Sequence, residues 1–226
     1  MKKLIVVAVA AVLALSGCAA QPATFTDDDA KQVLFGDITQ ASLTSLGLST
    51  SDSTIQTDTV ANYVAGISDG DTAFDPEECA DSARPLVLLG DDAKSTDTFY
   101  AMPTLTSGST SITVRARLFG SDAAAETFIA KFQSANENCT DFTVTQSGKT
   151  DQVQLTVSEA ADDSKGFRLD TVAGVDNQVI TIRTYIVREG NLAIAVQGQT
   201  NTDDDANLLV AASAAIYAQL TDGQPE

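Results

Sequence analysis

The chain has 226 residues, a length typical of one domain or of two small ones. It carries 13 Lys and Arg against 31 Asp and Glu, and the resulting net charge of −18 argues against binding to nucleic acid and against membrane attachment through a basic patch. Because the sequence has no His, it cannot form Ser-His-Asp or Cys-His nucleophile systems, His-ligated zinc or an imidazole acid-base pair.

The N-terminus has the pattern of an export signal. Lys2 and Lys3 precede an apolar run over residues 4–15. As a helix this run of 12 residues would be about 18 Å long, well short of the roughly 30 Å hydrocarbon core of a bilayer. Residues 1–17 are therefore interpreted as a signal peptide rather than a membrane span.

The apolar run ends in a match to the bacterial lipobox, Leu15-Ser16-Gly17-Cys18. We expect cleavage before Cys18 and attachment of a diacylglycerol, with acyl chains such as palmitate, to its thiol; an ordinary secretory signal with an incidental cysteine is the alternative. Cleavage removes two Lys and no acid, so the net charge moves from −18 to −20 and the lipid must hold the protein at the membrane. Residues 18–25 would be a lipidated tether on the extracytoplasmic face of the cell membrane, about 25 Å long when extended.

The other two cysteines fit an oxidising compartment. With Cys18 acylated, Cys79 and Cys139 allow only one pairing. Closing a loop of 60 residues would contribute about 4 kcal/mol on chain entropy alone. Two unrelated buried thiols are the alternative.

Two helices are predicted to begin at a Thr followed by three Asp, at residues 26–29 and 202–205. The Thr can cap free backbone amides while the acids lie at the positive end of the helix dipole. Residues 39–73 are rich in Ser, Thr, Asp and Gly, so residues 26–74 are interpreted as a helix followed by a polar loop region. The apolar face of the first helix would carry Ala30, Val33, Leu34 and Ile38.

The main domain is predicted over residues 75–226. Asp75-Pro76-Glu77-Glu78 is typical of a helix start, and this helix would run to about Leu89. Its buried face would carry Cys79, Ala83, Leu86 and Val87. A strand follows in which Ile112, Val114, Ala116 and Leu118 point one way and Thr113, Arg115 and Arg117 the other.

The next predicted helix is capped by Gly120-Ser121-Asp122. Its apolar stripe comprises Ala125, Phe128, Ile129 and Phe132, and Cys139 follows its end.

From residue 141 onward the sequence predicts consecutive strands, joined in one place by the tight turn Glu189-Gly190-Asn191. The chain closes with a helix whose core residues are Leu209, Ser213, Ile216, Tyr217 and Leu220. The strands are expected at 141–147, 151–158, 166–172, 178–188 and 191–199, and the helix at 203–220. Together these elements predict a single α+β domain, an antiparallel β-sheet packed with three or four helices.

This arrangement resembles the actinobacterial family of PknH-like extracellular sensor domains and their lipoprotein relatives, over about residues 75–220. The matching residues are Pro76 with Cys79, Ser121–Phe132 with Cys139, and Asn191–Leu220. The family pattern has four cysteines and a Trp close before the Cys at the end of this helix. This chain has one pair of cysteines besides Cys18, and it has Asn136-Glu137-Asn138 in place of the Trp segment. The resemblance implies an α+β domain with an antiparallel sheet and a groove, held outside the membrane, that binds a small ligand. It implies no catalytic residue.

Three polar motifs are better explained by local structure than by a ligand. Ser147-Gly148-Lys149-Thr150 lacks the first Gly and the following helix of a phosphate-binding loop, so it is interpreted as a hairpin turn. Asp69-Gly70-Asp71 and the two Asp triplets lack the closing Glu of a calcium loop. The sequence therefore predicts no cofactor and no metal site.

A ligand groove is predicted from the cations that lie on strands. If the strands that carry Arg115, Arg117 and Arg183 are neighbours, their polar face forms a cationic strip that suits an anionic ligand. A solvated sheet face paired with nearby Asp and Glu is the alternative.

These observations lead to a membrane-anchored envelope lipoprotein with a sensor-like domain that binds a small or amphipathic ligand and is not an enzyme. The alternative is a structural or assembly module that binds another envelope protein. A hydrolase that uses a carboxylate pair is disfavoured because no two of the many acids stand out in the sequence.

Overall fold

The computed structural model describes residues 23–50, 54–65, 72–80, 88–89, 94–146, 148–159, 166–175 and 178–222. The predicted signal peptide, the lipobox with Cys18, the Asp69-Gly70-Asp71 motif and residues 81–87 of a predicted helix lie outside these ranges. Within them, no helix is both long and apolar enough to cross a bilayer.

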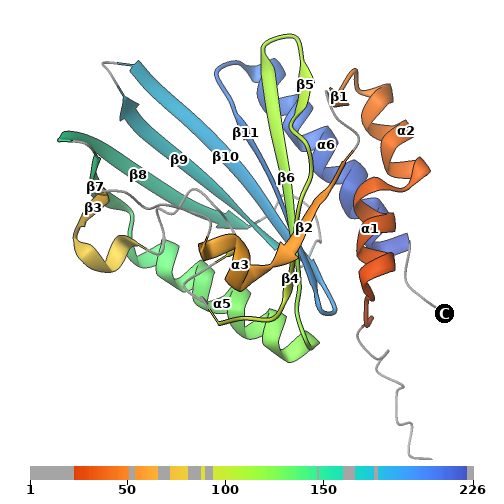
Figure 1. The fold of residues 1–226 in the computed structure, drawn as a ribbon. Coiled ribbons are helices and arrows are strands. Elements are labelled where there is room, and N and C mark those ends of the chain that lie inside the picture. The colour runs from red at the N-terminus through yellow and green to blue at the C-terminus, as the bar shows by residue number, and fades with distance from the viewer. Residues whose placement is uncertain are drawn as a thin grey trace, which may run out of the picture.

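The described strands form one antiparallel sheet of 11 strands, in which β6, β11 and β10 lie at the centre (Figure 1). The order is β1-β5-β6-β11-β10-β9-β8-β7-β3, with β4 also paired to β6 and β2 paired to β4. The bounds are β1 Ser49–Thr50, β2 Gln56–Thr59, β3 Thr72–Asp75, β4 Thr98–Ala101, β5 Leu105–Ser107, β6 Thr110–Leu118, β7 Asp141–Gln146, β8 Lys149–Glu159, β9 Gly166–Val175, β10 Gln178–Glu189 and β11 Leu192–Gln199.

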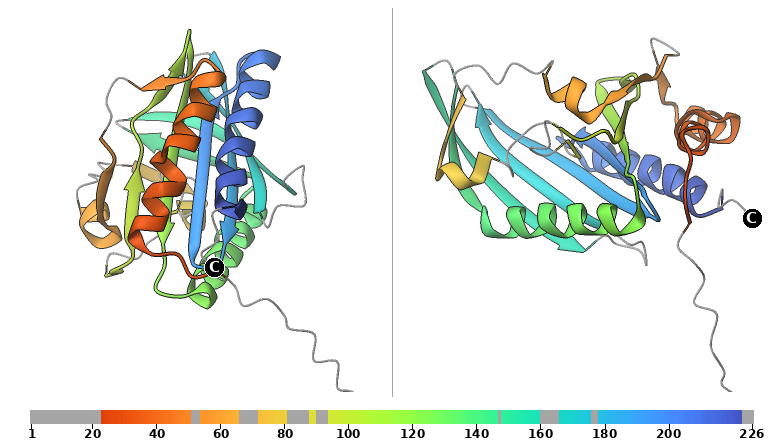
Figure 2. Two further views of the ribbon diagram at one scale, coloured as in Figure 1. Left: turned by 90° about the vertical axis from the view of Figure 1, so that its right-hand side faces the viewer. Right: turned by 60° about the horizontal axis from the view of Figure 1, so that its bottom comes forward.

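Helices cover the sheet from both sides (Figure 2). On one side lie α1 (Asp27–Phe35), α2 (Asp37–Ser45) and α6 (Asp203–Asp222), and on the other lie α3 (Val60–Ala65) and α5 (Asp122–Asn138). The single 3₁₀ turn η1 (Glu77–Cys79) follows β3. This architecture confirms the predicted α+β class, an antiparallel sheet with helices in a single domain.

The strand register decides which side chains share a face, because directly opposed residues of neighbouring strands point the same way. Arg115 of β6 is opposite Ala195 of β11, which is opposite Ile186 of β10. We call this side of the sheet the α5 face. Val114 is opposite Val196, so these residues lie on the other side, the α6 face.

The α6 face has the larger core, built on capped helices as expected. Thr26 and Thr202 begin α1 and α6, and each hydroxyl accepts a hydrogen bond from the backbone amide of the Asp three residues on, at 3.3 and 3.1 Å. Residues buried on this face come from α1, α2, α6, β6, β10 and β11. They include Val33, Leu34, Leu43, Val114, Tyr185, Ile194, Val196, Leu209, Ile216 and Leu220.

One predicted core residue of the first helix is wrong. Ile38 is 61% exposed. The chain leaves the helix at Gly36, which is extended at φ −63° and ψ 159°, and begins α2 in a new direction at Asp37. A Cβ at Gly36 would lie 2.4 Å from the carbonyl oxygen of Gln32, so the break needs Gly. The prediction for Ile38 assumed that the 3.6-residue period of α1 continues, but α1 ends before Gly36.

The polar region 39–73 is also more ordered than predicted. Its described parts continue α2 and form β1, β2, α3 and the start of β3. The strands β1 and β2 pair with β5 and β4 through backbone hydrogen bonds, which do not require apolar side chains. Such pairing depends on a distant partner strand, so composition alone predicted loops.

The strands after residue 141 and their turns confirm the sequence prediction to within a few residues. Gly148 and Gly190 have φ of +77° and +51°, and each lies in a tight turn between antiparallel strands. Gln146 pairs with Lys149 across the first turn, so the segment that resembles a phosphate-binding loop is a hairpin.

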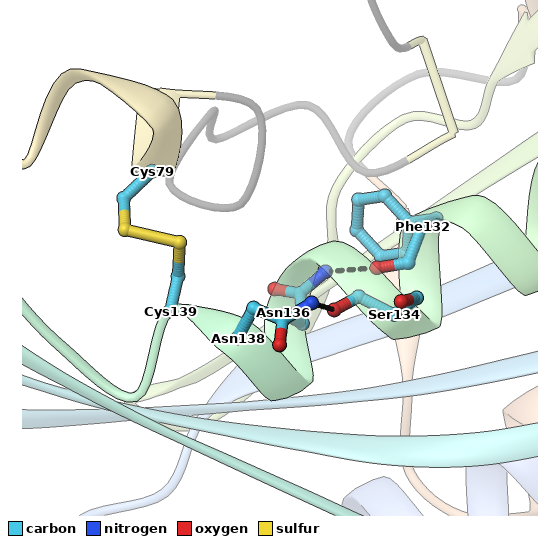
Figure 3. The surroundings of a disulfide bond; sticks show 6 residues. All are labelled: Cys79, Phe132, Ser134, Asn136, Asn138 and Cys139. Atoms are coloured by element: carbon cyan, nitrogen blue, oxygen red, sulfur yellow. Dashed lines mark hydrogen bonds between the residues drawn. A yellow bond between two sulfur atoms is a disulfide. The ribbon is translucent and has the colours of Figure 1, made fainter.

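A disulfide joins Cys79 of η1 to Cys139 at the end of α5, as predicted (Figure 3). The two Cα atoms lie 5.5 Å apart, and both cysteines are buried with Phe142, Val153 and Leu169 against β7, β8 and β9. In the same view, the amides of Asn136 and Asn138 turn back along α5 to bond backbone carbonyls. The bond therefore holds the segment after β3 onto the outer strands of the α5 face.

We predict that this disulfide contributes on the order of 4 kcal/mol, because it closes a loop of 60 residues in the unfolded chain. The double variant Cys79→Ala/Cys139→Ala should unfold at lower urea concentration than the wild type. Non-reducing peptide mapping of protein isolated without reductant should find the cross-linked pair. Two free thiols, or an unchanged urea midpoint, would contradict the prediction.

Candidate functional site

The best candidate for a ligand site is a cavity of about 410 Å³ beside the centre of the sheet. It lies where β4 gives way to β5, and residues of α3 and of the segment before it complete its wall. Its lining combines one cation, one aromatic ring, hydroxyl and amide groups and small apolar side chains. The lining residues are Thr54, Gln56, Tyr63, Ala101, Met102, Pro103, Thr104, Thr113, Val114 and Arg115.

The cavity exists because β4 and β5 are not one continuous strand. Ala101 pairs with Arg115 and Leu105 pairs with Ile112, so the three residues 102–104 oppose the two residues 113–114. This is the count of a β-bulge, which bends a strand and frequently lies beside binding sites. Pro103 in the bulge has no backbone N–H to give to the ladder.

Arg115 places a positive charge on the wall of this cavity. Its Nη1 donates a hydrogen bond to Oε1 of Gln197, 3.2 Å away, and Nε2 of Gln197 donates to Oγ1 of Thr184, also at 3.2 Å. Burial lowers the pKa of the Arg115 guanidinium, and nearby Tyr63 opposes this shift. An arginine keeps its charge at neutral pH even so.

The cavity also has an aromatic and aliphatic surface. Tyr63 of α3 packs on Phe99 of β4, with ring centroids 4.6 Å apart. Ala101, Met102 and Pro103 extend this surface along the bulge. The site therefore combines a cation with an aromatic and aliphatic surface, which suits a molecule with an anionic and an apolar part.

Arg117 was predicted to line the groove, and the structure shows that it is instead a core residue. Its side chain is only 2% exposed. Nε and Nη2 donate to the Asp97 carboxylate at 3.0 and 2.7 Å, and Nη1 donates to the carbonyl oxygens of Leu88 and Leu89. The guanidinium carbon lies 4.5 Å from the ring centroids of both Phe119 and Phe128. Arg117 therefore fastens chain segments over the α5 face and is not one of the residues that line the cavity.

Arg183 also lies outside the cavity, on the α6 face. β11 separates β6 from β10, and Arg183 is opposite Gly198, which is opposite Ile112, whereas Arg115 points to the other side. Nε of Arg183 donates to the Asp170 carboxylate at 2.7 Å, and this hydrogen bond raises the pKa of the guanidinium. The predicted cationic strip formed by Arg115, Arg117 and Arg183 is therefore wrong. Of these arginines, the cavity contains Arg115.

Several site residues were missed at the level of sequence. Tyr63 lies in the stretch interpreted as loop, and Gln197 and Thr184 lie on strands without a pattern that singles them out. Pro103 gave the one usable signal, because a proline between two strand segments marks a break in pairing. The identity of the cavity's cation depends on register, which the sequence does not show.

Two other cavities are less suited to a specific ligand. One of about 460 Å³ lies at the end of α5 and contains the carboxylates of Glu137 and Asp141. One of about 550 Å³ lies between α1 and β2, where Lys31 is already paired with Asp27. Among the described residues, no three His, Cys, Asp or Glu side chains are grouped so that they could hold a metal ion.

Neither protein-family models nor the sequences of curated proteins match this chain. Among solved structures, the extracellular domain of PknH from Mycobacterium tuberculosis aligns with a TM-score of 0.53 and 10% identity over 88% of this chain and 98% of that domain. A putative uncharacterized protein from Mycobacterium smegmatis aligns with a TM-score of 0.46 and 15% identity over 78% of this chain and 95% of that protein. The resemblance to a PknH-like extracellular domain is thus confirmed at the level of the fold.

We predict that Arg115 and Arg117, two residues apart on one strand, differ sharply in their effect on stability. Arg117→Met should lower the free energy of unfolding by about 3–5 kcal/mol, because it leaves the partly buried Asp97 carboxylate without its cation and the Leu88 and Leu89 carbonyl groups without their Arg117 donor. Arg115→Met should cost less, since Arg115 lines a cavity and one of its donors is satisfied by the neutral amide of Gln197. Urea unfolding at neutral pH measures both, and equal losses would contradict these assignments.

Proposed function

We propose that the protein is a lipid-anchored lipoprotein of a bacterial envelope, whose extracytoplasmic, sensor-like domain binds a small anionic or amphipathic ligand and catalyses no reaction. The observation that carries the proposal is the Arg115 cavity, whose lining combines a buried cation with an aromatic ring and small apolar residues. The ligand would place its anionic group at Arg115 and its apolar part against Tyr63 and Pro103.

The size and the charge of the cavity support a specific ligand. A volume of about 410 Å³ is within the range that small-molecule sites occupy, about 300–1,000 Å³. A guanidinium in a partly buried site attracts an anion more strongly than one in water does, because the local dielectric is lower. A single cation in such a site also favours an anion over the neutral molecules of the envelope, despite the chain's net charge of −18.

The location outside the cytoplasm is supported by three independent features. The lipobox and the apolar run before it are typical of exported lipoproteins. The disulfide between Cys79 and Cys139 is a kind of bond that persists in oxidising compartments. The fold is shared with the extracellular domain of PknH.

The ligand proposal is tested by Arg115→Gln, with Arg183→Gln as the matched control on the opposite face. Dodecanoate is a suitable probe because it combines a carboxylate with an alkyl chain, and dodecanol is its uncharged counterpart. Loss of a charge-assisted hydrogen bond is worth about 1.5–3 kcal/mol, so Arg115→Gln should weaken dodecanoate binding by roughly 10- to 100-fold in calorimetry. Arg183→Gln should bind it as the wild type does.

Native mass spectrometry of protein purified from the envelope gives a second readout. A copurifying small molecule should be present in the wild type and in Arg183→Gln and be lost from Arg115→Gln. If Arg115→Gln binds dodecanoate as tightly as the wild type does, the cavity is not the site. Capture of one stoichiometric envelope protein without any small molecule would favour the assembly module instead.

The anchor is tested by Cys18→Ser. Because the lipid is attached to sulfur, this variant should lose all labelling by a fatty-acid probe. The protein should accumulate unprocessed or be released from the membrane fraction. Labelling that persists in Cys18→Ser would contradict the assignment of Cys18.

A further inference from the structure

The first described residues are docked tightly to one end of the domain. Phe25 is 2% exposed, and its backbone N–H donates to Oδ1 of Asn191 at 2.7 Å. Nδ2 of Asn191 donates in return to the carbonyl oxygens of Phe25 and Phe119, at 3.1 and 3.0 Å. The buried Asn191 side chain thus joins the incoming chain to the β10–β11 turn and to the end of β6. We call this arrangement the Asn191 clamp.

The neighbouring Gly190 makes an even closer approach possible. A Cβ at this position would lie 1.7 Å from the carbonyl oxygen of Ala23, and Gly190 has a φ of +51°. Both features need a residue without a side chain. Ala23 itself packs against the core of the α6 face. The predicted tether, residues 18–25, is therefore shortened, because its last three residues belong to the domain.

The chain stays at this end of the sheet as it enters α1. Thr26 caps the helix, and the Tyr100 hydroxyl donates to the Asp27 carboxylate at 2.5 Å. Figure 1 shows the start of α1 and the β10–β11 turn at the same end of the molecule, with the β5–β6 turn at the opposite end. The two ends are connected by the full length of β6.

The remaining tether is too short to let the domain turn over. From Cys18 to Ala23 the chain makes five Cα steps, which span at most about 18 Å. The nine residues of β6 alone extend about 27 Å. A lipid on Cys18 can therefore bring the clamped end to the membrane surface, whereas the β5–β6 turn would stay far from it.

We propose that the anchored domain has one orientation, in which the end formed by the β10–β11 turn and residues 119–122 faces the lipid headgroups and the β5–β6 turn faces away. This inference rests on the proposed lipid at Cys18. The facing end carries Asp122 and the acids at the start of α1, with Arg188 already paired to Asp122, so it stands against the headgroups without inserting. The Arg115 cavity lies about 10 Å along β6 from Leu118, so its ligand would arrive from the aqueous envelope rather than from within the bilayer.

The chain has no Trp, so single tryptophans can report the orientation by energy transfer. Gly120→Trp adds a probe at the facing end, where a Cβ meets no atom within 4 Å, and Ser109→Trp adds one in the exposed β5–β6 turn. Each full-length, lipidated variant is reconstituted into phosphatidylcholine vesicles that contain a small fraction of dansyl-phosphatidylethanolamine. Transfer to the dansyl group should be at least several-fold stronger from Gly120→Trp than from Ser109→Trp.

The matched control lengthens the tether. A 20-residue Gly-Ser insert between Ala20 and Gln21 adds a root-mean-square reach of about 25 Å, so the difference between the two probes should largely disappear. Equal or reversed transfer with the natural tether, or an unchanged difference with the long one, would overturn the proposal. Failure of lipid attachment gives a separate result, because neither probe would then transfer and the protein would not float with the vesicles.

Discussion

The structure depends on one constraint, that β11 is buried on both of its faces. Five of its eight residues are Leu, Ala, Ile or Val in an unbroken buried run. Small Ala193 and Ala195 point to the α5 face, and Ile194 and Val196 point to the α6 face. Because both faces must be shielded from water, helices have to pack on each side of the central strands, and the positions of α5 and α6 follow from this requirement.

The two arginines of β6 show how one face can hold both a structural cation and the cation of the proposed ligand site. Arg117 lies where the α5 face is covered, so its charge is matched by Asp97 and its guanidinium packs against the rings of Phe119 and Phe128. Arg115 lies one pleat further along, where the bulge at residues 102–104 leaves a cavity. Arg115 and Arg117 are the same residue type on the same face of β6, and they differ in whether other chain segments cover them. The proposed function therefore depends on where along β6 this covering ends.

The Asn191 clamp and the disulfide each fix a different part of the sheet. The Asn191 amide joins the incoming chain to the β10–β11 turn, so the tether of the proposed lipid anchor is connected directly to the central strands. The disulfide holds the outer strands in a similar way, at the far edge of the same sheet. The centre and the edge are thus each fixed by a contact between residues far apart in the sequence. The cavity lies on the other side of β11 from the disulfide, between β6 and the bulge at residues 102–104.

Much of this fold could be predicted from the sequence because the responsible interactions are local. The Thr-Asp caps, the glycine turns at Gly148 and Gly190 and the period-two strands after residue 141 each follow from neighbouring residues. The pairing of Cys79 with Cys139 followed from there being only one possible partner. Tertiary structure alone decided that β11 separates β6 from β10, that Arg183 faces away from Arg115, and that Asn191 binds the incoming chain. These features depend on register between strands, and because side chains alternate with a period of two, a shift of one residue moves a side chain to the opposite face.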